Sequence, residues 1–417
     1  MTNGEMRLAL SEAQEASQQV RQLVVVGRLL IGEDQLADAM EVAERASKIA
    51  AASPAHLAQA WQLKHLIYFE EANYVAALEA AERVIALNPS SAAGFMQRAA
   101  ALSKLGRQEE ALVDAERAIS IAPGNSEVWR CQAYIFRQLN RYAEAQRALD
   151  HALALDPRNV KALVDLAEVH ASLGHHRAAV AVCTQALHLM REDEARPVGS
   201  SKGSAELARA LVIQARNYDD LHNYAKALEA SNEALQLRPL YSDAWLIKSV
   251  ALYHLKRLDE VLAASERFVE LKPSTSIGWT NLCTILIDLK RYEDALKAFD
   301  RVIAISPDDR PVRSQRAALL AQLIAQGVIP KSSPRYEDPD LDDQHVWLIA
   351  ARKLHTLRDR EAALLACDEG IRRCPTKVDI YGTKMLLQFE LHRYREITAT
   401  WQAAWQARRS SAPSRRV

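Results

Sequence analysis

The sequence has little of what builds sheets and tight turns. Its 417 residues include only 13 glycines and 14 prolines, and aromatic residues make up 6%. Proteins made of strands need aromatic and β-branched residues in the strands and Gly or Pro in their many turns. Alanine and leucine are abundant instead, and both favour helices. The composition therefore predicts an all-α fold.

The chain also lacks an excess of charge of either sign. Lys+Arg and Asp+Glu number 53 each, so the formal net charge is +0 at pH 7. Proteins that attract nucleic-acid phosphates or anionic membranes usually carry a basic excess. We therefore expect neither nucleic acid nor a membrane as a partner.

Targeting signals and paired cysteines are missing as well. No basic region followed by an apolar core opens the sequence, and no later stretch is apolar enough to cross a bilayer. The five cysteines are odd in number and show no close paired spacing, which favours buried free thiols in a reducing compartment. We expect a cytoplasmic location.

Motifs for catalysis are absent too. There is no glycine-rich phosphate loop, no nucleophile elbow and no His/Cys spacing typical of zinc. His170, His175 and His176 gather near one turn, where solvated or packed histidines are favoured over a metal site. Cys367 and Cys374 lie seven residues apart, where two buried thiols are favoured over a redox pair. We expect no enzyme activity, no cofactor and no metal.

What the sequence does have is a 34-residue period. The stretch 129–157 opens with Trp129, places Phe136 seven residues later and Ala145 further on, and closes with a proline. The closing prolines recur in two runs: Pro89, Pro123 and Pro157, then Pro239, Pro273 and Pro307. The units open at Trp61, Phe95, Trp129, Leu163, Leu211, Trp245 and Trp279.

This pattern resembles the tetratricopeptide-repeat (TPR) family, whose arrays consist of helix-turn-helix units. The resemblance implies a right-handed α-solenoid of about nine stacked hairpins. The alanines would let the two helices of a hairpin approach closely, and each proline would end a second helix.

Seven segments are expected along the chain. They are a capping or frayed segment (1–18), a first repeat block (19–190), an inserted loop or hinge (191–204), a central repeat block (205–325), a Pro-rich acidic loop (326–342), C-terminal hairpins with a cap (343–407) and a disordered basic tail (408–417). Val261 stands where most units carry alanine, so its hairpin is expected to splay slightly. In the acidic cluster 336–343, a solvated loop is favoured over a docking site or a lid.

The resemblance also implies a concave groove lined by the first helices of the hairpins. The predicted partner-binding residues are Gln62, Phe69, Arg130, Tyr134, Arg137, Glu168, Arg216 and Tyr253. Arg130, Tyr134 and Arg137 are spaced to point the same way along one helix, which suggests an acidic or carboxylate-bearing ligand. Alternatively, Glu127, Glu168 and Asp219 neutralise the arginines within the chain.

Two specialised TPR functions do not fit the register. The clamp that holds the tails of heat-shock chaperones needs lysines, asparagines and an arginine on consecutive first helices. The matching positions here hold Gln62 and Leu66, Met96 and Ala100, then Arg130 and Tyr134. An asparagine ladder, as in sugar-transferring TPR enzymes, is absent because Asn281 stands alone.

The sequence therefore predicts a non-catalytic scaffold or adaptor that binds a peptide or protein in the groove. The alternative is a sensor or regulatory subunit of a larger bacterial assembly. Such a subunit would switch an effector when a ligand binds, with a hinge expected at 191–204.

Overall fold

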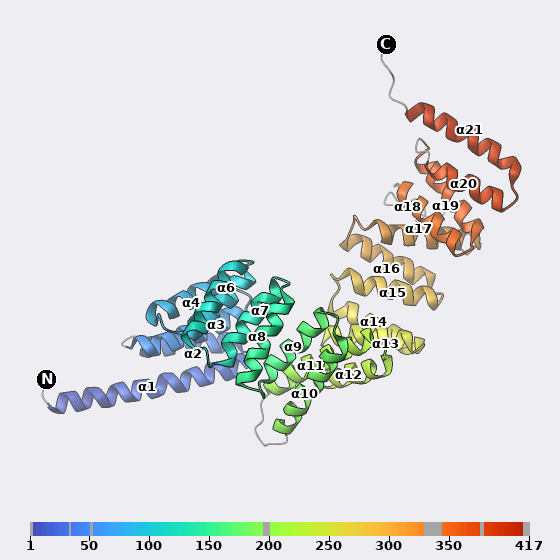
Figure 1. Cartoon of the computed structure of the whole chain (residues 1–417). Helices are drawn as coiled ribbons and strands as arrows, with labels where there is room; N and C mark the ends of the chain where they lie inside the picture. Colours follow the sequence, from blue (N-terminus) through green and yellow to red (C-terminus); the bar gives the residue numbers. More distant parts are fainter. Residues whose placement is uncertain are drawn as a thin grey trace, which may run out of the picture. The chain divides into compact units, whose positions relative to one another are not determined.

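The fold is all-α, as predicted. The computed structural model describes residues 3–32, 35–50, 53–194, 201–328, 344–375 and 379–411. Within these ranges the regular secondary structure consists of 21 α-helices without a strand (Figure 1). None of these helices is both long enough and apolar enough to cross a membrane.

The helices belong to two compact units that divide between Leu255 and Lys256. The first unit contains α1 (Asn3–Gly32), α2 (Leu36–Ile49), α3 (Pro54–Glu70), α4 (Tyr74–Leu87), α5 (Ala92–Lys104), α6 (Gln108–Ile121), α7 (Ser126–Gln138), α8 (Tyr142–Leu155), α9 (Val160–Ser172), α10 (His176–Glu194), α11 (Ser201–Asp220), α12 (Tyr224–Leu237) and α13 (Ser242–His254). The second contains α14 (Leu258–Leu271), α15 (Ser276–Asp288), α16 (Tyr292–Ile305), α17 (Arg310–Ala325), α18 (Gln344–Thr356), α19 (Arg360–Arg373), α20 (Asp379–Glu390) and α21 (Tyr394–Ser411).

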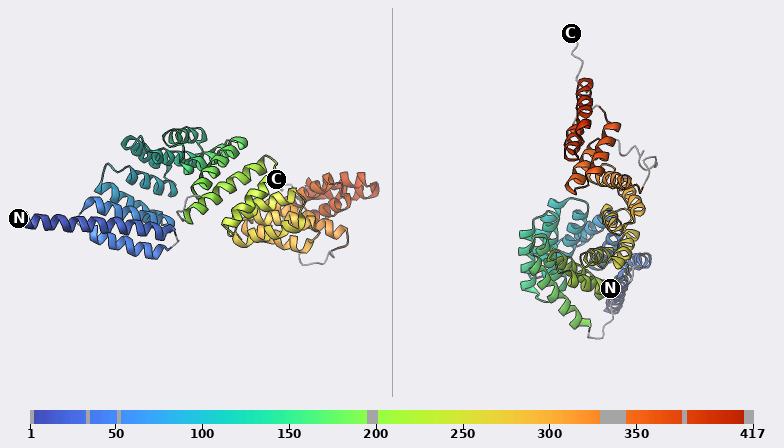
Figure 2. Two further views of the ribbon diagram at one scale, coloured as in Figure 1. Left: turned by 90° about the horizontal axis from the view of Figure 1, so that it is seen from below. Right: turned by 90° about the vertical axis from the view of Figure 1, so that its right-hand side faces the viewer.

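Within each unit, helices pack as hairpins and each hairpin packs on the next. In the first unit the pairs run from α1 with α2 to α11 with α12 (Figure 2). In the second unit, α15 pairs with α16, α18 with α19 and α20 with α21, while α17 packs on α16, α18 and α19. The interval that follows α17, residues 329–343, lies outside the described residues.

The 34-residue period is also visible in the backbone conformation of the hairpin turns. Each turn places one residue in the left-handed region, for example Gly106 at φ 81° and Asn140 at φ 57°. Glycine and asparagine reach this region most easily. The same conformation recurs at Ala72, Gly174, His222, Lys256, Lys290, Arg358 and His392.

A second device joins consecutive hairpins. The indole Nε1 of Trp129 donates a hydrogen bond to the carbonyl oxygen of Pro123 at 2.9 Å, and Trp279 does the same to Pro273 at 2.9 Å. In the last hairpin the Tyr381 hydroxyl donates to Pro375 O at 2.9 Å. The large residue that opens a unit is thus hydrogen-bonded to the proline that ends the preceding unit.

Apolar packing between hairpins follows one rule. Ile135 of α7 is fully buried in a cluster with Ala111 and Ala115 of the preceding second helix, α6. Ile67 of α3 packs in the same way with Ala39 and Ala43 of α2. In both places, a branched residue of a first helix therefore packs against small residues of the second helix that precedes it.

Several segment boundaries in the structure differ from those expected from the sequence. One continuous helix, α1, runs through the boundary expected at residue 18. Residues 191–194 and 201–204 are helical rather than loop, because α10 and α11 are each longer than a regular repeat helix. The tail expected to be disordered from 408 is helical to Ser411. The remaining parts of the loops and the tail, 195–200, 329–343 and 412–417, lie outside the described residues.

The expected hinge is also not where the compact units divide. Helices α10 and α11, on either side of the 191–204 insertion, pack on each other inside the first unit. The division falls instead inside the expected 205–325 block, in the turn between α13 and α14. Val261 lies on α14, after that turn, and its side chain is fully buried.

Candidate functional site

Charged side chains follow three consecutive first helices of the first unit. Arg130 and Arg137 lie on α7, Asp165 and Glu168 on α9, and Arg209 on α11. On α7 and α9 the charged residues are seven and three residues apart, so those on one helix share a face. The charges alternate from helix to helix, and each helix therefore meets the opposite sign on its neighbour. We call these five residues and Glu127 the ion-pair row.

At one end of the row, Arg130 connects two helices. Its guanidinium donates to the Glu127 carboxylate at 2.7 Å from Nη2 and at 3.1 Å from Nε. Nη1 reaches Asp165 on α9 at 3.2 Å. Asn159 Nδ2 also donates to Glu127, at 3.0 Å. Arg130 thus makes three hydrogen bonds to carboxylates of its own chain.

The rest of the row joins α7 and α11 through α9. Arg137 donates to Glu168 and lies 3.9 Å from Asp165. From the opposite side, Arg209 Nη2 contacts Asp165 at 2.9 Å and Glu168 at 2.9 Å. The two carboxylates of α9 are therefore shared between arginines on both neighbouring helices.

The side chains of the ion-pair row are partly buried, so their ion pairs are less screened by water than pairs on the surface. The Asp165 side chain is 13% exposed and that of Arg137 is 21% exposed. Burial lowers the pKa of the Arg130 guanidinium, but the hydrogen bond to Glu127 and the charge of Asp165 outweigh it, so the pKa lies above its ordinary value. Burial likewise lowers the pKa of Arg209, and Glu168 and Asp165 raise it further than burial lowers it. For Glu127, burial raises the pKa of the carboxyl, whereas Arg130 and Asn159 lower it to a net value below its usual range.

A pocket of about 410 Å³ opens beside the row. Its lining includes Arg137 and Glu168 of the row and brings in Arg216, Asn217 and Asp220 from α11. The Arg216 side chain is 55% exposed, and its nearest carboxylate is Asp243 at 3.8 Å. Its charge faces solvent more than that of any arginine in the row. Arg216 lines the same pocket as Arg137 and Glu168.

The other predicted groove residues make contacts of their own. Gln62 accepts a hydrogen bond from Gln97 at its backbone oxygen, at 3.3 Å. Phe69 packs edge-on against Tyr74 with ring centroids 5.4 Å apart. Tyr134 lies under the Lys104 ammonium at 5.8 Å, and Tyr253 packs edge-on against His254. These residues are not brought to the ion-pair row, except Tyr134, which shares α7.

Sequence reasoning missed Asp165 and Arg209. Val164 of α9 and Val212 of α11 occupy the positions that the repeat register assigns to the groove, but both are buried, at 0% and 2% exposure. The alternation of apolar and charged residues at 163–168 is a signal that could have identified Asp165. Arg209 precedes the residue at which its repeat opens, so the period alone does not reveal it.

Of the candidate metal and redox residues, His176 contacts polar side chains of α11, Cys367 is buried and Cys374 is half-buried. His176 Nδ1 lies 3.0 Å from Asn217 Oδ1 and 3.3 Å from Asp220. No cluster of metal-ligating side chains occurs in the ranges that the structure describes. Cys183, Cys283 and Cys367 are buried thiols, and burial raises their pKa to about 12. Such thiols stay protonated and are poor nucleophiles.

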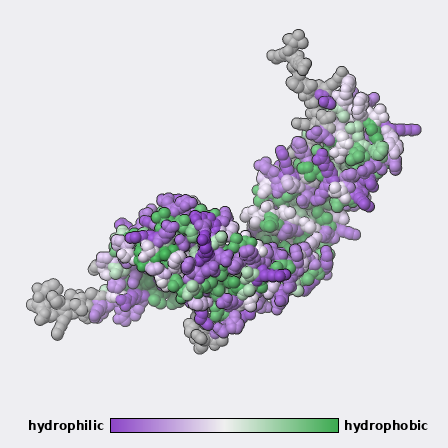
Figure 3. Space-filling model, in the orientation of Figure 1, coloured by the Kyte–Doolittle hydropathy of each residue, from purple (hydrophilic) through white to green (hydrophobic). Residues whose placement is uncertain are grey.

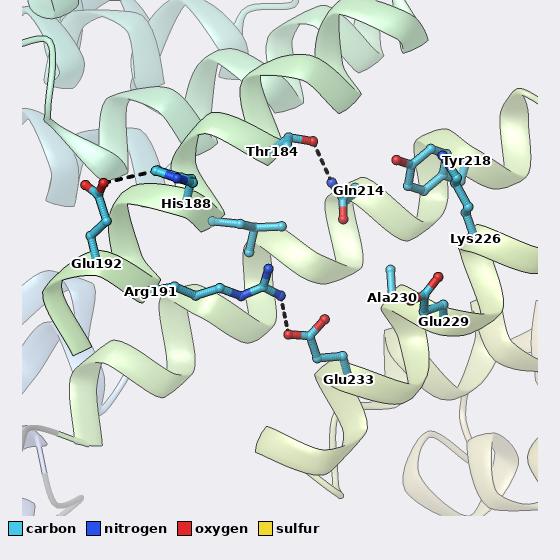
Figure 4. A pocket seen from close by; sticks show the side chains of 11 residues that line it. Thr184, His188, Arg191, Glu192, Gln214, Tyr218, Lys226, Glu229, Ala230 and Glu233 are labelled. Atoms are coloured by element: carbon cyan, nitrogen blue, oxygen red, sulfur yellow. Dashed lines mark hydrogen bonds and ion pairs between the residues drawn. The ribbon is translucent and has the colours of Figure 1, made fainter. Parts of the chain in front are cut away.

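A second hollow, of about 550 Å³, lies between the second helices α10 and α12 (Figure 4). Helix α11 contributes Gln214, whose amide donates to Thr184 at 3.0 Å. Arg191 of α10 pairs with Glu233 of α12 across the hollow, and His188 lies 3.5 Å from Glu192 on its own helix. The lining also includes Lys226 and Glu229 of α12.

The hairpins, their turns and the polar face on consecutive first helices define a helical repeat protein. Models of the tetratricopeptide repeat match residues 66–126, 136–196, 214–274 and 278–309, which together are more than half of the chain. The chain belongs to the tetratricopeptide-repeat family. Repeats of this family typically form non-catalytic scaffolds for interactions between proteins. No curated protein matches the sequence.

Solved structures with a similar fold include the human IFIT1 dimer with m7Gppp-AAAA, at 14% identity and a TM-score of 0.51, over 94% of this chain and 90% of that chain. A tetratricopeptide repeat protein from Parabacteroides merdae is 15% identical, with a TM-score of 0.45 over 63% of this chain and 98% of that chain. YrrB, described as a TPR protein with an unusual peptide-binding site, is 19% identical, with a TM-score of 0.37 over 48% of this chain and 95% of that chain. At these identities the likeness concerns the fold alone.

Proposed function

We propose that the protein is a non-catalytic adaptor that holds a peptide or protein partner against the first helices α7, α9 and α11. The observation that carries the proposal is the ion-pair row together with the adjoining pocket at Arg216. Three helices joined by shared ion pairs form a surface that is ordered before a partner arrives, which reduces the entropy lost on binding.

The chemistry of this surface favours a partner that carries charges of both signs. Arg130, Arg137 and Arg209 are balanced by Glu127, Asp165 and Glu168, so a purely acidic ligand would have to displace a carboxylate that is already bound. Arg216 is the arginine best placed to bind an acidic group of the partner, and Asp220 in the same pocket can accept from a basic group. We therefore propose that an acidic group of the partner binds in the pocket at Arg216, and not along the whole ion-pair row.

The absence of a charge excess still argues against nucleic acid as the main partner, and the free thiols suit a reducing cytoplasm. The regulatory-subunit alternative stays a prediction from the sequence.

The test is affinity purification from nuclease-treated lysate with the wild-type chain and two variants. Arg216→Glu reverses the charge in the pocket. Arg107→Glu makes the same change at an arginine whose side chain is 49% exposed, in the turn between α5 and α6. Arg130 and Arg137 are unsuitable because their loss would break the ion-pair row itself. We expect partners to be lost with Arg216→Glu and kept with Arg107→Glu.

Equal partner lists for all three proteins would contradict the proposed groove. Loss of the partners on nuclease treatment, in a comparison with untreated lysate, would show that RNA or DNA mediates the binding and would contradict the choice of a protein partner.

A further inference from the structure

The last hairpin exposes the face on which a following hairpin would pack. Tyr381 is equivalent to Trp129, because both donate a hydrogen bond to the carbonyl oxygen of the proline six residues earlier. The residue twenty positions further on is Leu149 in one hairpin and Trp401 in the other. Leu149 is fully buried, whereas Trp401 is 58% exposed.

Inside the array this position is always covered. Ala81, Ala115 and Cys183 occupy it in other hairpins of the first unit, and each is fully buried. In the second unit the position holds Phe299, which is only 1% exposed. A large aromatic residue at this place is therefore compatible with a following first helix, and among the described residues no first helix packs on Trp401.

The first helix, α1, exposes the opposite side of the same interface. In α3, α7 and α9, a branched residue six positions after the opening residue packs on the preceding second helix; it is Ile67, Ile135 or Val169, each fully buried. Counting from Leu23, the equivalent residue of α1 is Leu29, which is 62% exposed. Val25, one turn earlier, is 59% exposed.

The apolar surface at the C-terminal end extends beyond one residue. Leu386 and Phe389 on α20 are 50% and 59% exposed. Hydrophobic residues are visible at the surface over α20 and α21 in the space-filling view (Figure 3). Exposed apolar side chains gathered at one end of a protein commonly mark an interaction site.

We propose that α1 of one copy of this chain packs on the α20–α21 hairpin of a second copy, so that the array continues from chain to chain. A second copy is the occupant that fits, because the two open faces are the two sides of an interface that the chain already forms repeatedly within itself. The contact is heterologous, so one copy can engage a second through each end. It involves neither the ion-pair row nor the pocket at Arg216, and it is independent of the proposed adaptor function.

The test measures mass by sedimentation equilibrium for the wild type, Leu29→Glu, Trp401→Glu and a mixture of the two variants. For the wild type we expect the average mass to rise with concentration above the 46.5 kDa of one chain. Each variant alone keeps only one working face and stays a monomer. The mixture has one working face of each kind and forms a one-to-one dimer that grows no further.

Val113→Glu serves as the control, because Val113 is an exposed apolar residue, at 64%, on the regular helix α6. It should associate like the wild type. Circular dichroism confirms that every variant is folded.

Three results would overturn the proposal. One is a wild type that stays monomeric at all concentrations. Another is a dimer that survives Leu29→Glu but not Trp401→Glu, which would mean that two C-terminal hairpins pair with each other. The third is a mixture of the two variants that remains monomeric while the wild type associates.

Discussion

The two units use one hairpin design, and both have ion pairs between hairpins, such as Arg316 with Asp300 in the second unit. They differ in two features: an ion-pair network shared by three first helices lies in the first unit, and the largest buried aromatic side chains lie in the second. In the first unit, α7, α9 and α11 are connected by partly buried arginines and carboxylates centred on Asp165. In the second unit, α15 carries no charged residue before Asp288, and its Thr280 and Thr284 hydroxyls donate to carbonyls of their own helix. That unit instead contains the two largest fully buried side chains in the described residues, Trp347 and Phe299. The comparison indicates that turns and small residues specify the hairpin, while the contact between hairpins is free to be ionic or apolar.

The largest expected effect is the loss of an aromatic side chain from the second unit. Trp347 of α18 is fully buried, and the Arg373 guanidinium lies 5.6 Å from its ring centroid. Trp347→Ala leaves a large cavity and should destabilise the packing of α17, α18 and α19 by about 3–5 kcal/mol. Hydrogen exchange followed by mass spectrometry should show faster exchange in these helices and unchanged exchange in α7–α11. Trp129→Ala, at a half-buried tryptophan of the first unit, is the control and should cost less. Equal losses at both sites would remove the contrast between the units.

A smaller loss is expected when the ionic contact is broken. Asp165→Ala takes away the carboxylate that Arg130 and Arg209 share, and leaves partly buried guanidinium groups with too few acceptors. We expect the first unit to lose about 2 kcal/mol, less than for a fully buried pair because the site is partly hydrated. Asp294→Ala removes the partner of Arg291 and Lys297 on the surface of the second unit and should cost less than about 1 kcal/mol.

Urea unfolding, resolved by hydrogen exchange, measures both changes. Raising the salt concentration should narrow the gap between Asp165→Ala and the wild type, because salt screens the ion pairs that only the wild type has. A gap that does not depend on salt would show that packing rather than charge joins α7, α9 and α11.

Much of the hairpin design could be predicted from the sequence because it depends on local, repeated residues. Pro123 ends the segment after α6, Ala145 is fully buried between helices, and the period places the opening residues correctly. The pairing of Arg130 with Glu127 was also among the alternatives, since residues three apart on a helix are neighbours.

The contacts across hairpins were harder to predict. Arg209 contacts Asp165 across 44 residues, and the insertion between α10 and α11 shifts the register of every residue after it. The composition of the sequence likewise does not reveal the division at Leu255, because no Gly- or Pro-rich linker is present there. The nearest departure from the repeat pattern is Val261 in place of an alanine, and its side chain is fully buried. Long-range pairings depend on how hairpins stack, and a repeat period fixes only what lies within a hairpin.

The smallest expected effect is a difference between the two units in how the stability of a hairpin depends on pH. His65 of α3 is buried at 3% exposure, and its Nδ1–H donates to the Ala77 carbonyl oxygen of α4 at 2.9 Å. The equivalent residue in α15 is Cys283, whose thiol donates to Ala295 O at 3.8 Å. Burial lowers the pKa of His65, only partly offset by the bond to Ala77, so protonation favours the unfolded chain as the pH falls below about 6.5.

Stability from neutral His65 is therefore complete above its unfolded pKa and is lost as the pH falls toward the folded value, by at most about 1.4 kcal/mol per pH unit. Between pH 7.5 and 5.5, α3 and α4 should exchange amide hydrogens faster after correction for intrinsic rates, while α15 and α16 should not, since the Cys283 thiol stays protonated throughout this range. His65→Cys copies the second unit and should abolish the pH dependence whatever it costs in packing. If wild-type α3 and α4 were equally protected at both pH values, burial of the imidazole would not govern the stability of this hairpin, and the contrast with Cys283 would fail.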